Sequence, residues 1–511
     1  MASDATPPAP SPWPSPSVRE REGSRGWRGV AALQLLAAAI LGAAPAAAQA
    51  AIALTPCRLS SPLASAHVAA RCGTLEVPED RARPGGRRIS LAVAVVPAEA
   101  PQAAPAPVFV LAGGPGQAIR EVFPLLAPAF GRIGRARDLV LVDQRGTGGS
   151  GRLACPALDA PERVLDDPAK EVAAVAACAR SLDADLARYG TDDFVADLEA
   201  VREALGYARV DAIGFSYGTR AALAWARAHP ARIRTLVLDG VVPFEEVVGG
   251  SFEEDGQAAL DRLFRRCAAE PLCARSFPAP AAELRALAAR LARRPERVRT
   301  RHPLTGAPLE STFGLDQLRG VVGAFLYQAE TAAVLPPMLH AAASGDPGPL
   351  AAQGVAATAD LEAGLSRPLQ LSILCAEDVP LVVDAPPEAD ARRLLGRSVR
   401  DAFRRACAAW PVAAVRPAWR APWRADVPAL LLSGEADPVT PPRWADRLAR
   451  DLPRARQVVL AGQGHGIFAR GCVPRLVAEF LDAGGAEGLD LSCADAIRPP
   501  PPFVDFLGGA P

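Results

Sequence analysis

The chain has 511 residues, of which 50% are apolar and 22% are charged, a composition typical of a globular protein rather than a disordered one. Lysine plus arginine and aspartate plus glutamate both number 56, so the formal net charge is zero. A nucleic-acid-binding protein normally carries a basic excess or patch, so this balance argues against that class. The length predicts several domains, or one large domain with an insertion.

The first 50 residues have the pattern of a secretory signal peptide. Arginines precede an apolar run at 29–43, and small residues, Ala48 and Ala50, end the segment. We expect cleavage after Ala50 and export to the periplasm or the medium, with no stable membrane span afterwards. The run is short for a membrane helix. Retention as an N-terminal anchor is one alternative, and a translation start downstream, for example at Val18, is another.

Short runs rich in valine, leucine and isoleucine alternate with helical patterns along most of the chain. Such runs are typical of strands buried on both faces, and their alternation with helices predicts an α/β fold with a mostly parallel sheet. The expected strands lie at 89–96, 108–112, 138–142, 210–215, 235–238, 429–432 and 457–460.

The alternation stops near Pro243 and resumes near Val427, and the residues between have mostly helical patterns. We therefore expect a core formed by residues 51–243 and 426–511, with a large helical cap at 244–425 inserted before the last strands.

All ten cysteines follow residue 50, and an even number in an exported protein favours disulfides. Pairing in chain order is the simplest arrangement, although the sequence alone does not decide it. The pairs would be Cys57–Cys72, Cys155–Cys178, Cys267–Cys273, Cys375–Cys407 and Cys472–Cys493. Neither the cysteines nor the histidines have the spacing of a zinc site, and we expect no metal and no cofactor.

Two glycine-rich loops follow the expected strands at 108–112 and 138–142. The first, Leu111-Ala-Gly-Gly-Pro-Gly116, lets backbone N–H groups approach a reacting group, because glycine has no side chain; an ordinary glycine and proline turn is the alternative. In the second, at 143–150, Asp143 and Arg145 are expected to pair and to brace the first loop.

The sharpest chemical signal lies at 210–220. It predicts a strand, a tight turn Gly214-Phe-Ser-Tyr-Gly218 and a helix, which is the nucleophile-elbow pattern in its required context. The turn needs small residues two positions before and after Ser216, and it presents the serine hydroxyl at the carboxyl edge of the sheet. For the oxyanion that a serine attack creates, we expect the N–H groups of Gly114 and Tyr217 as donors.

A nucleophilic serine needs a base, and the base needs an orienting carboxylate. His465 fits the order serine, acid, histidine, because it lies in a loop after the last expected strand; the other four histidines fit worse. Asp437 is the favoured acid, since its loop follows the strand at 429–432 and would point towards Ser216. Glu435 is the rival, but it lies closer to the end of that strand.

Taken together, these motifs resemble the secreted prolyl and tripeptidyl aminopeptidase family of α/β-hydrolases, including its tripeptidyl-aminopeptidase-like C-terminal region. The resemblance covers nearly the whole chain after residue 50. It is carried by the segments 112–116, 143–150, 214–219, 434–437 with Pro441, and 464–465, and by 72–78, 374–378 and 407–411.

The resemblance implies an α/β-hydrolase fold with Ser216, Asp437 and His465 as a catalytic triad. It implies a serine aminopeptidase that removes residues, Pro-containing or as short di- or tripeptides, from free N-termini, and a cap that limits access to small or unfolded peptides. Many relatives have histidine where this chain has Ala112, a change that a loop with backbone donors should tolerate.

An aminopeptidase must bind a free ammonium group, which requires a carboxylate in the pocket wall. Glu377 is the favoured candidate, because a disulfide at the neighbouring Cys375 would fix its position; Glu253, Glu254 and Asp378 are the others. Two alternative functions remain open. One is an esterase or general acyl hydrolase with the same triad, and the other is a non-catalytic binding protein on the same fold.

Overall fold

The computed structural model describes residues 51–509, except 63, 105, 160–167, 362–363, 385, 387–392 and 416. The expected signal peptide at 1–50 lies outside the described residues, so its cleavage and the export of the chain stay predictions. In the part of the chain that is described, no helix is both long enough and apolar enough to cross a membrane.

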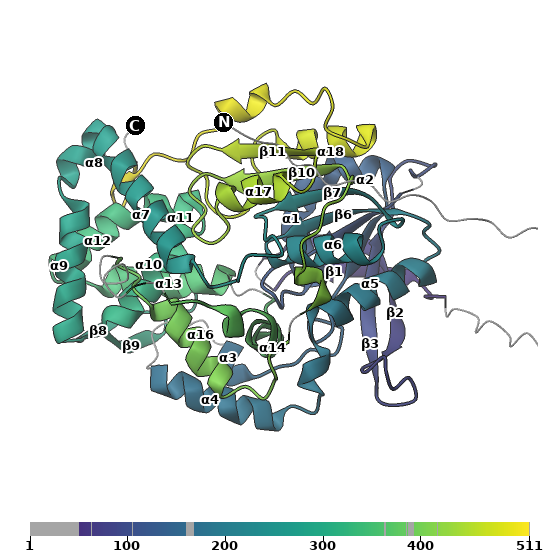
Figure 1. Cartoon of the computed structure of the whole chain (residues 1–511). Helices are drawn as coiled ribbons and strands as arrows, with labels where there is room; N and C mark the ends of the chain where they lie inside the picture. Colours follow the sequence, from purple (N-terminus) through teal and green to yellow (C-terminus); the bar gives the residue numbers. More distant parts are fainter. Residues whose placement is uncertain are drawn as a thin grey trace, which may run out of the picture. The chain divides into compact units, whose positions relative to one another are not determined.

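A nine-stranded sheet in the order β1-β2-β3-β5-β4-β6-β7-β10-β11 forms the core (Figure 1). The six strands from β5 to β11 in this order run parallel, and β1 to β3 are antiparallel. The strands are β1 (Thr55–Ser60), β2 (His67–Pro78), β3 (Arg88–Val96), β4 (Val108–Leu111), β5 (Leu139–Val142), β6 (Val210–Phe215), β7 (Ile233–Asp239), β10 (Ala429–Gly434) and β11 (Ala455–Leu460).

This sheet confirms the expected α/β architecture. The seven predicted strands correspond to β3–β7, β10 and β11. Strands β1 and β2 were not predicted, because this edge hairpin has few fully buried side chains and therefore lacks the apolar run that marks a buried strand.

Side chains alternate between the two faces of the sheet, and helices cover both faces. In β4, Val108 and Val110 belong to the apolar cluster with α1, α2 and α18, whereas Phe109 and Leu111 belong to the cluster with α5, α6 and α17. These helices are α1 (Ile119–Leu126), α2 (Gly131–Ala136), α5 (Thr191–Ala204), α6 (Tyr217–Ala228), α17 (Pro442–Ala449) and α18 (Val473–Ala483). Four further elements lie outside the sheet and the insertion described below: α3 (Pro156–Asp159), α4 (Pro168–Ser181), β12 (Phe503–Asp505) and β13 (Gly508–Gly509).

The insertion between β7 and β10 is mostly helical, as expected, and has an apolar core of its own (Figure 1). It also contains an antiparallel hairpin, β8 with β9, which was not predicted. The elements are α7 (Phe252–Ala269), α8 (Pro271–Ser276), α9 (Pro280–Arg293), β8 (Glu296–Arg301), β9 (Pro308–Phe313), α10 (Leu315–Leu326), α11 (Ala329–Ala333), α12 (Leu335–Ala343), α13 (Gly348–Leu361), α14 (Arg367–Glu377) and α16 (Ser398–Ala408). We call this insertion the cap; its limits at 244 and 425 stay predictions.

Five disulfides join the cysteines in the chain order given above. One of them, Cys375–Cys407, links α14 to α16 within the cap. Disulfides form and persist in oxidising compartments, so this set fits an exported protein.

Candidate active site

Ser216 lies in a sharp turn between β6 and α6. Its φ is 52° and its ψ is −122°, and it is the one non-glycine residue with a positive φ among those described. A Cβ on Gly214 would lie 2.4 Å from the Gly218 carbonyl oxygen, and a Cβ on Gly218 would lie 2.4 Å from that of Leu111. Both positions therefore require glycine, as the elbow pattern predicts, and the strained turn holds the serine between them.

His465 and Asp437 form a hydrogen-bonded pair at the carboxyl ends of β10 and β11. The Nδ1 atom of His465 lies 2.8 Å from Oδ2 of Asp437. The other carboxylate oxygen, Oδ1, accepts hydrogen bonds from the N–H groups of Val439 at 2.9 Å and Thr440 at 2.8 Å. Nδ1 therefore carries its proton towards the carboxylate, which leaves Nε2 as the basic nitrogen.

Thr440 adds a contact that the sequence did not assign. Its hydroxyl donates to Oδ2 of Asp437 at 2.6 Å and also lies 2.9 Å from Nδ1 of His465. Thr440 lies between Asp437 and Pro441, two positions of the motif described above, but nothing in the sequence indicated its partners.

Asp437 is buried and His465 is partly buried, and their pKa values follow from burial, nearby charge and hydrogen bonding. Burial opposes the charged form of Asp437, but the nearby imidazole and the hydrogen bonds outweigh burial and hold its pKa below the usual value. Burial likewise opposes the imidazolium form of His465, but the charge and hydrogen bond of Asp437 raise its pKa above the usual value. Once His465 accepts a proton, the imidazolium and the Asp437 carboxylate thus form a favourable ion pair.

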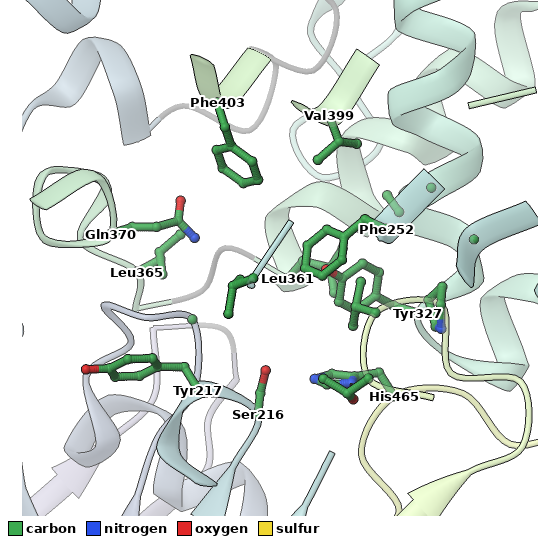
Figure 2. Close-up of a pocket in the computed structure, with 18 of the residues that line it drawn as sticks. Ser216, Tyr217, Phe252, Tyr327, Leu361, Leu365, Gln370, Val399, Phe403 and His465 are labelled. Carbon is green, nitrogen blue, oxygen red and sulfur yellow. The ribbon is translucent and has the colours of Figure 1, made fainter. Parts of the chain in front are cut away.

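Ser216 and His465 lie on the floor of one cavity of about 530 Å³, and cap residues including Phe403 and Val399 line the opposite side (Figure 2). Most of the lining is apolar. Gln117, Gln328 and Gln370 add amides, and the arginines in the lining that the structure describes are Arg319 and Arg367. The lining residues are Gly114, Gln117, Ser216, Tyr217, Val242, Val248, Phe252, Gly256, Arg319, Gly320, Gly323, Ala324, Tyr327, Gln328, Thr358, Leu361, Leu365, Arg367, Gln370, Leu374, Leu395, Val399, Phe403, Pro438, Val439, Thr440, Trp444 and His465.

The cap contacts the histidine loop directly. The N–H of His465 donates to the carbonyl of Tyr327 at 2.6 Å, and the side-chain amide of Gln328 donates to the carbonyl of His465 at 3.0 Å. A Cβ on Gly464 would lie 2.2 Å from the Tyr327 carbonyl oxygen, so this close approach requires glycine.

The cap also contacts the first glycine-rich loop. The N–H of Ser366 donates to the carbonyl of Gly116 at 2.8 Å, and the N–H of Ala118 donates to that of Gly364 at 2.9 Å. The cap is thus hydrogen-bonded to two of the loops that surround Ser216.

The two expected oxyanion donors, Gly114 and Tyr217, both line the cavity. Tyr217 is the first residue of α6, so its N–H has no acceptor within the helix. Gly113, to which the sequence assigned no role, packs directly against the serine, because a Cβ on it would lie 2.9 Å from Cβ of Ser216.

The expected pairing of Asp143 with Arg145 is wrong. Arg145 is buried and makes a bidentate salt bridge with Asp197, in which Nε and one terminal nitrogen of the guanidinium each lie 2.7 Å from a carboxylate oxygen. Asp143 instead accepts from the N–H groups of Arg120 and Gly149, each at 3.0 Å. Because Arg120 lies in α1, shortly after the first glycine-rich loop, Asp143 supports the end of that loop without Arg145.

Glu377 is buried and is not among the residues that line the cavity. Its two oxygens accept from the N–H and the hydroxyl of Thr191, both at 2.7 Å, and that hydroxyl also contacts the Tyr217 hydroxyl at 2.8 Å. Glu377 therefore lies two hydrogen bonds away from the lining residue Tyr217. Burial raises the pKa of Glu377 to about 7.

The other candidate acids of the cap make ion pairs. Glu253 contacts Arg400 at 3.4 Å, Glu254 contacts Arg393 at 3.2 Å, and Asp378 contacts Arg220 at 2.8 Å. Glu435, the rival to Asp437, accepts from the N–H of Gly462 at 2.9 Å instead of contacting His465.

Comparison with known proteins gives relatives of modest identity. The chain is 33% identical to serine protease Hip1 of Mycobacterium tuberculosis over 204 residues, which cover 37% of this chain and 39% of Hip1. It is 28% identical to tripeptidyl aminopeptidase of Streptomyces lividans over 192 residues, covering 34% of this chain and 35% of that protein. Each match thus spans well under half of the relative.

Among solved structures, proline iminopeptidase of Mycobacterium smegmatis is similar at 17% identity with a TM-score of 0.41, covering 80% of this chain and 98% of the other. The model of the alpha/beta hydrolase fold family matches residues 106–471, which include β4 to β11, the cap, Ser216, Asp437 and His465. The chain therefore belongs to the alpha/beta hydrolase fold family.

Proposed function

We propose that the protein is an exported serine peptidase that cleaves peptides through an acyl-enzyme on Ser216. One observation carries the proposal: a serine held in a nucleophile elbow lies in the same cavity as a histidine that is hydrogen-bonded to a buried aspartate. Relatives that are named a serine protease and a tripeptidyl aminopeptidase support peptides as the substrate class.

In the first half of the reaction, Nε2 of His465 removes the proton from the Ser216 hydroxyl as Oγ attacks the substrate carbonyl carbon. Asp437 holds the imidazole tautomer and stabilises the imidazolium without itself being protonated. The N–H groups of Gly114 and Tyr217 donate to the oxyanion, a contribution of about 3–4 kcal/mol per donor. His465 then gives its proton to the leaving amine, and the acyl group remains on Ser216.

In the second half, His465 removes a proton from water, which attacks the acyl-enzyme, and Ser216 regains its proton as the acid is released. The base must be neutral at the start of each half. Because the pKa of His465 is raised, activity is expected to fall on the acid side as the imidazole is protonated before it can act.

We further propose that the enzyme removes short segments, including Pro-containing ones, from free N-termini. The aminopeptidase names among the relatives support this reading. Glu377 is the ammonium ligand that the sequence favours, and this role would require it to exchange its bonds with Thr191 for the substrate.

A general acyl hydrolase with the same triad is the second candidate. It is favoured by the charges of the described lining, because Arg319 and Arg367 repel an ammonium group rather than attract it. Both candidate functions proceed through the same acyl-enzyme, so they differ only in whether the substrate must have a free N-terminal amine.

The test measures chromophore release from Pro-, Ala- and Ala-Ala-Pro- substrates, from their N-acetylated forms and from a simple ester. A fluorophosphonate probe reports the reactivity of Ser216. Ser216→Ala should lower turnover by several orders of magnitude while the protein stays folded. Ser433→Ala is the matched control, since Ser433 is the last residue but one of β10, two strands away from β6, and its buried hydroxyl has no partner among the described residues.

Cleavage confined to free amines would support the aminopeptidase. Equal cleavage of blocked substrates, or of the ester alone, would move the assignment to the acyl hydrolase. Wild-type turnover in Ser216→Ala would refute the catalytic mechanism as a whole.

A further inference from the structure

A second buried aspartate, Asp239, lies beside the proposed triad. It ends β7, which is hydrogen-bonded in parallel to β6, the strand that leads to Ser216. Its exposed fraction is 2%. An aspartate at this depth is expensive unless its oxygens have partners, so its contacts indicate what it does.

Asp239 makes hydrogen bonds to the loops that carry the nucleophile and the base. Its main-chain carbonyl accepts from the N–H of Ser216 at 2.8 Å. Its carboxylate accepts from the N–H of Ile467 at 3.0 Å and from that of Phe468 at 2.9 Å. Ile467 follows His465 by two residues, so one residue links the two loops whose side chains must exchange a proton.

The next residue, Gly240, forms the surface beneath the imidazole. Its φ is 67°, and a Cβ on it would lie 2.8 Å from Cε1 of His465 and 3.0 Å from the Thr440 hydroxyl. The backbone at Gly240 therefore packs directly against the imidazole ring of His465, and this position has no room for a side chain.

The charged groups facing Asp239 are His465, from the loop after β11, and Asp437, from the loop after β10. Burial raises the pKa of Asp239 to about 6, although the two amide hydrogen bonds and His465 favour its carboxylate form. Reciprocally, Asp239 adds to Asp437 in raising the pKa of His465.

We propose that Asp239 is a positioning residue of the hydrolytic reaction, which fixes the histidine loop relative to Ser216 and supplies a second negative charge to the imidazolium. This inference rests on the proposed function. It assigns the residue a role beyond packing, because a buried apolar residue at the end of β7 would neither anchor the loop amides nor affect the ionisation of His465.

The test is Asp239→Asn in the full chain, with kcat and KM measured from pH 5 to 9 on the best substrate. The substitution preserves the size of the side chain but removes the charge. We expect kcat to fall about 10- to 100-fold with little change in KM, because the imidazolium forms only after substrate is bound. The acid limb of kcat/KM should move to lower pH, since His465 loses a negative neighbour.

Asp211→Asn is the matched control. Asp211 is another fully buried aspartate, near the opposite end of β6, where it accepts from the Thr235 hydroxyl at 2.6 Å. This variant should lose thermal stability while its acid limb stays in place. Nuclear magnetic resonance titration of the histidines, which number five in the sequence, gives the ionisation of His465 directly, with His465→Gln used for assignment.

A lower kcat together with a shifted limb and a lower His465 pKa would support the proposal. An unmoved limb and an unchanged His465 titration would overturn it, whatever happens to kcat. If Asp239→Asn does not fold, Asp239→Glu replaces it: retained charge should keep the limb near that of wild type while the displaced loop lowers kcat, and wild-type kcat would overturn the proposal. Failure of the proposed function is separate, because it appears as turnover that survives Ser216→Ala.

Discussion

The hydroxyl of Thr440 offers a sharp test of the geometry around the histidine. Thr440→Val removes one oxygen from a buried site and keeps the shape of the side chain. Among the described residues, Oδ2 of Asp437 contacts the Thr440 hydroxyl at 2.6 Å and Nδ1 of His465 at 2.8 Å, whereas Oδ1 accepts from two backbone amides. The substitution therefore removes one of four hydrogen bonds to the carboxylate, and the one that also contacts the imidazole.

A hydrogen bond to a charged group contributes about 1.5–3 kcal/mol. If that energy is lost where Asp437 supports the imidazolium, kcat/KM falls about 10- to 150-fold, since each 1.36 kcal/mol is tenfold in rate. The assay compares steady-state kinetics of Thr440→Val with Thr440→Ser, which retains the hydroxyl and should stay within a few-fold of wild type. Equal rates for the valine and serine variants would refute the reasoning, because the hydroxyl would then contribute nothing.

Three further predictions follow from the described contacts. Gly240→Ala should lower kcat well below that of Gly206→Ala, because both glycines have positive φ but only the first would place a Cβ against the His465 ring; equal losses would contradict this. Strong reductant should lower the melting temperature, since five local disulfides contribute roughly 2–4 kcal/mol each; an unchanged value would refute it. Burial raises the pKa of Glu377 to about 7 from 4.5, so its contribution to stability is lost as pH rises between these two values. The melting temperature of Glu377→Gln minus that of wild type should therefore increase between pH 5 and 8. A difference that stays constant over this range would contradict the prediction.

The parts of the fold that could be read from the sequence are those where local patterns and tertiary burial agree. Strands such as β4 and β5 are apolar at every position because helices cover both faces of the sheet, so a short unbroken run was sufficient evidence. The β8–β9 hairpin was missed because each strand has a single buried residue, Val298 in β8 and Phe313 in β9, so neither forms an apolar run within this region of helical periodicity.

The site was predictable to the extent that its chemistry requires fixed sequence spacing. The elbow around Ser216 is such a case, because its glycines are required by backbone contacts within a few residues. Asp239 could not be found in this way, since the partners of its carboxylate, Ile467 and Phe468, lie 228 and 229 residues further along the chain and its role depends on strand order. Arg145 was assigned to the wrong partner for the same reason: Asp143 is close in sequence, but Asp197 is the acid that α5 brings to it.

The hydrogen bonds between the cap and the histidine loop have a consequence for engineering and for divergence. Because the carbonyl of Tyr327 accepts from the N–H of His465, the cap that lines the cavity also helps to hold the proposed base in place. Under the proposed function, replacing the whole cap with that of a relative would therefore change the cavity lining and also remove a hydrogen bond that supports His465. Single substitutions of cavity-lining residues such as Phe252 or Val399 leave that backbone contact in place. New substrate preferences are therefore more readily obtained by substituting lining residues than by replacing the whole cap.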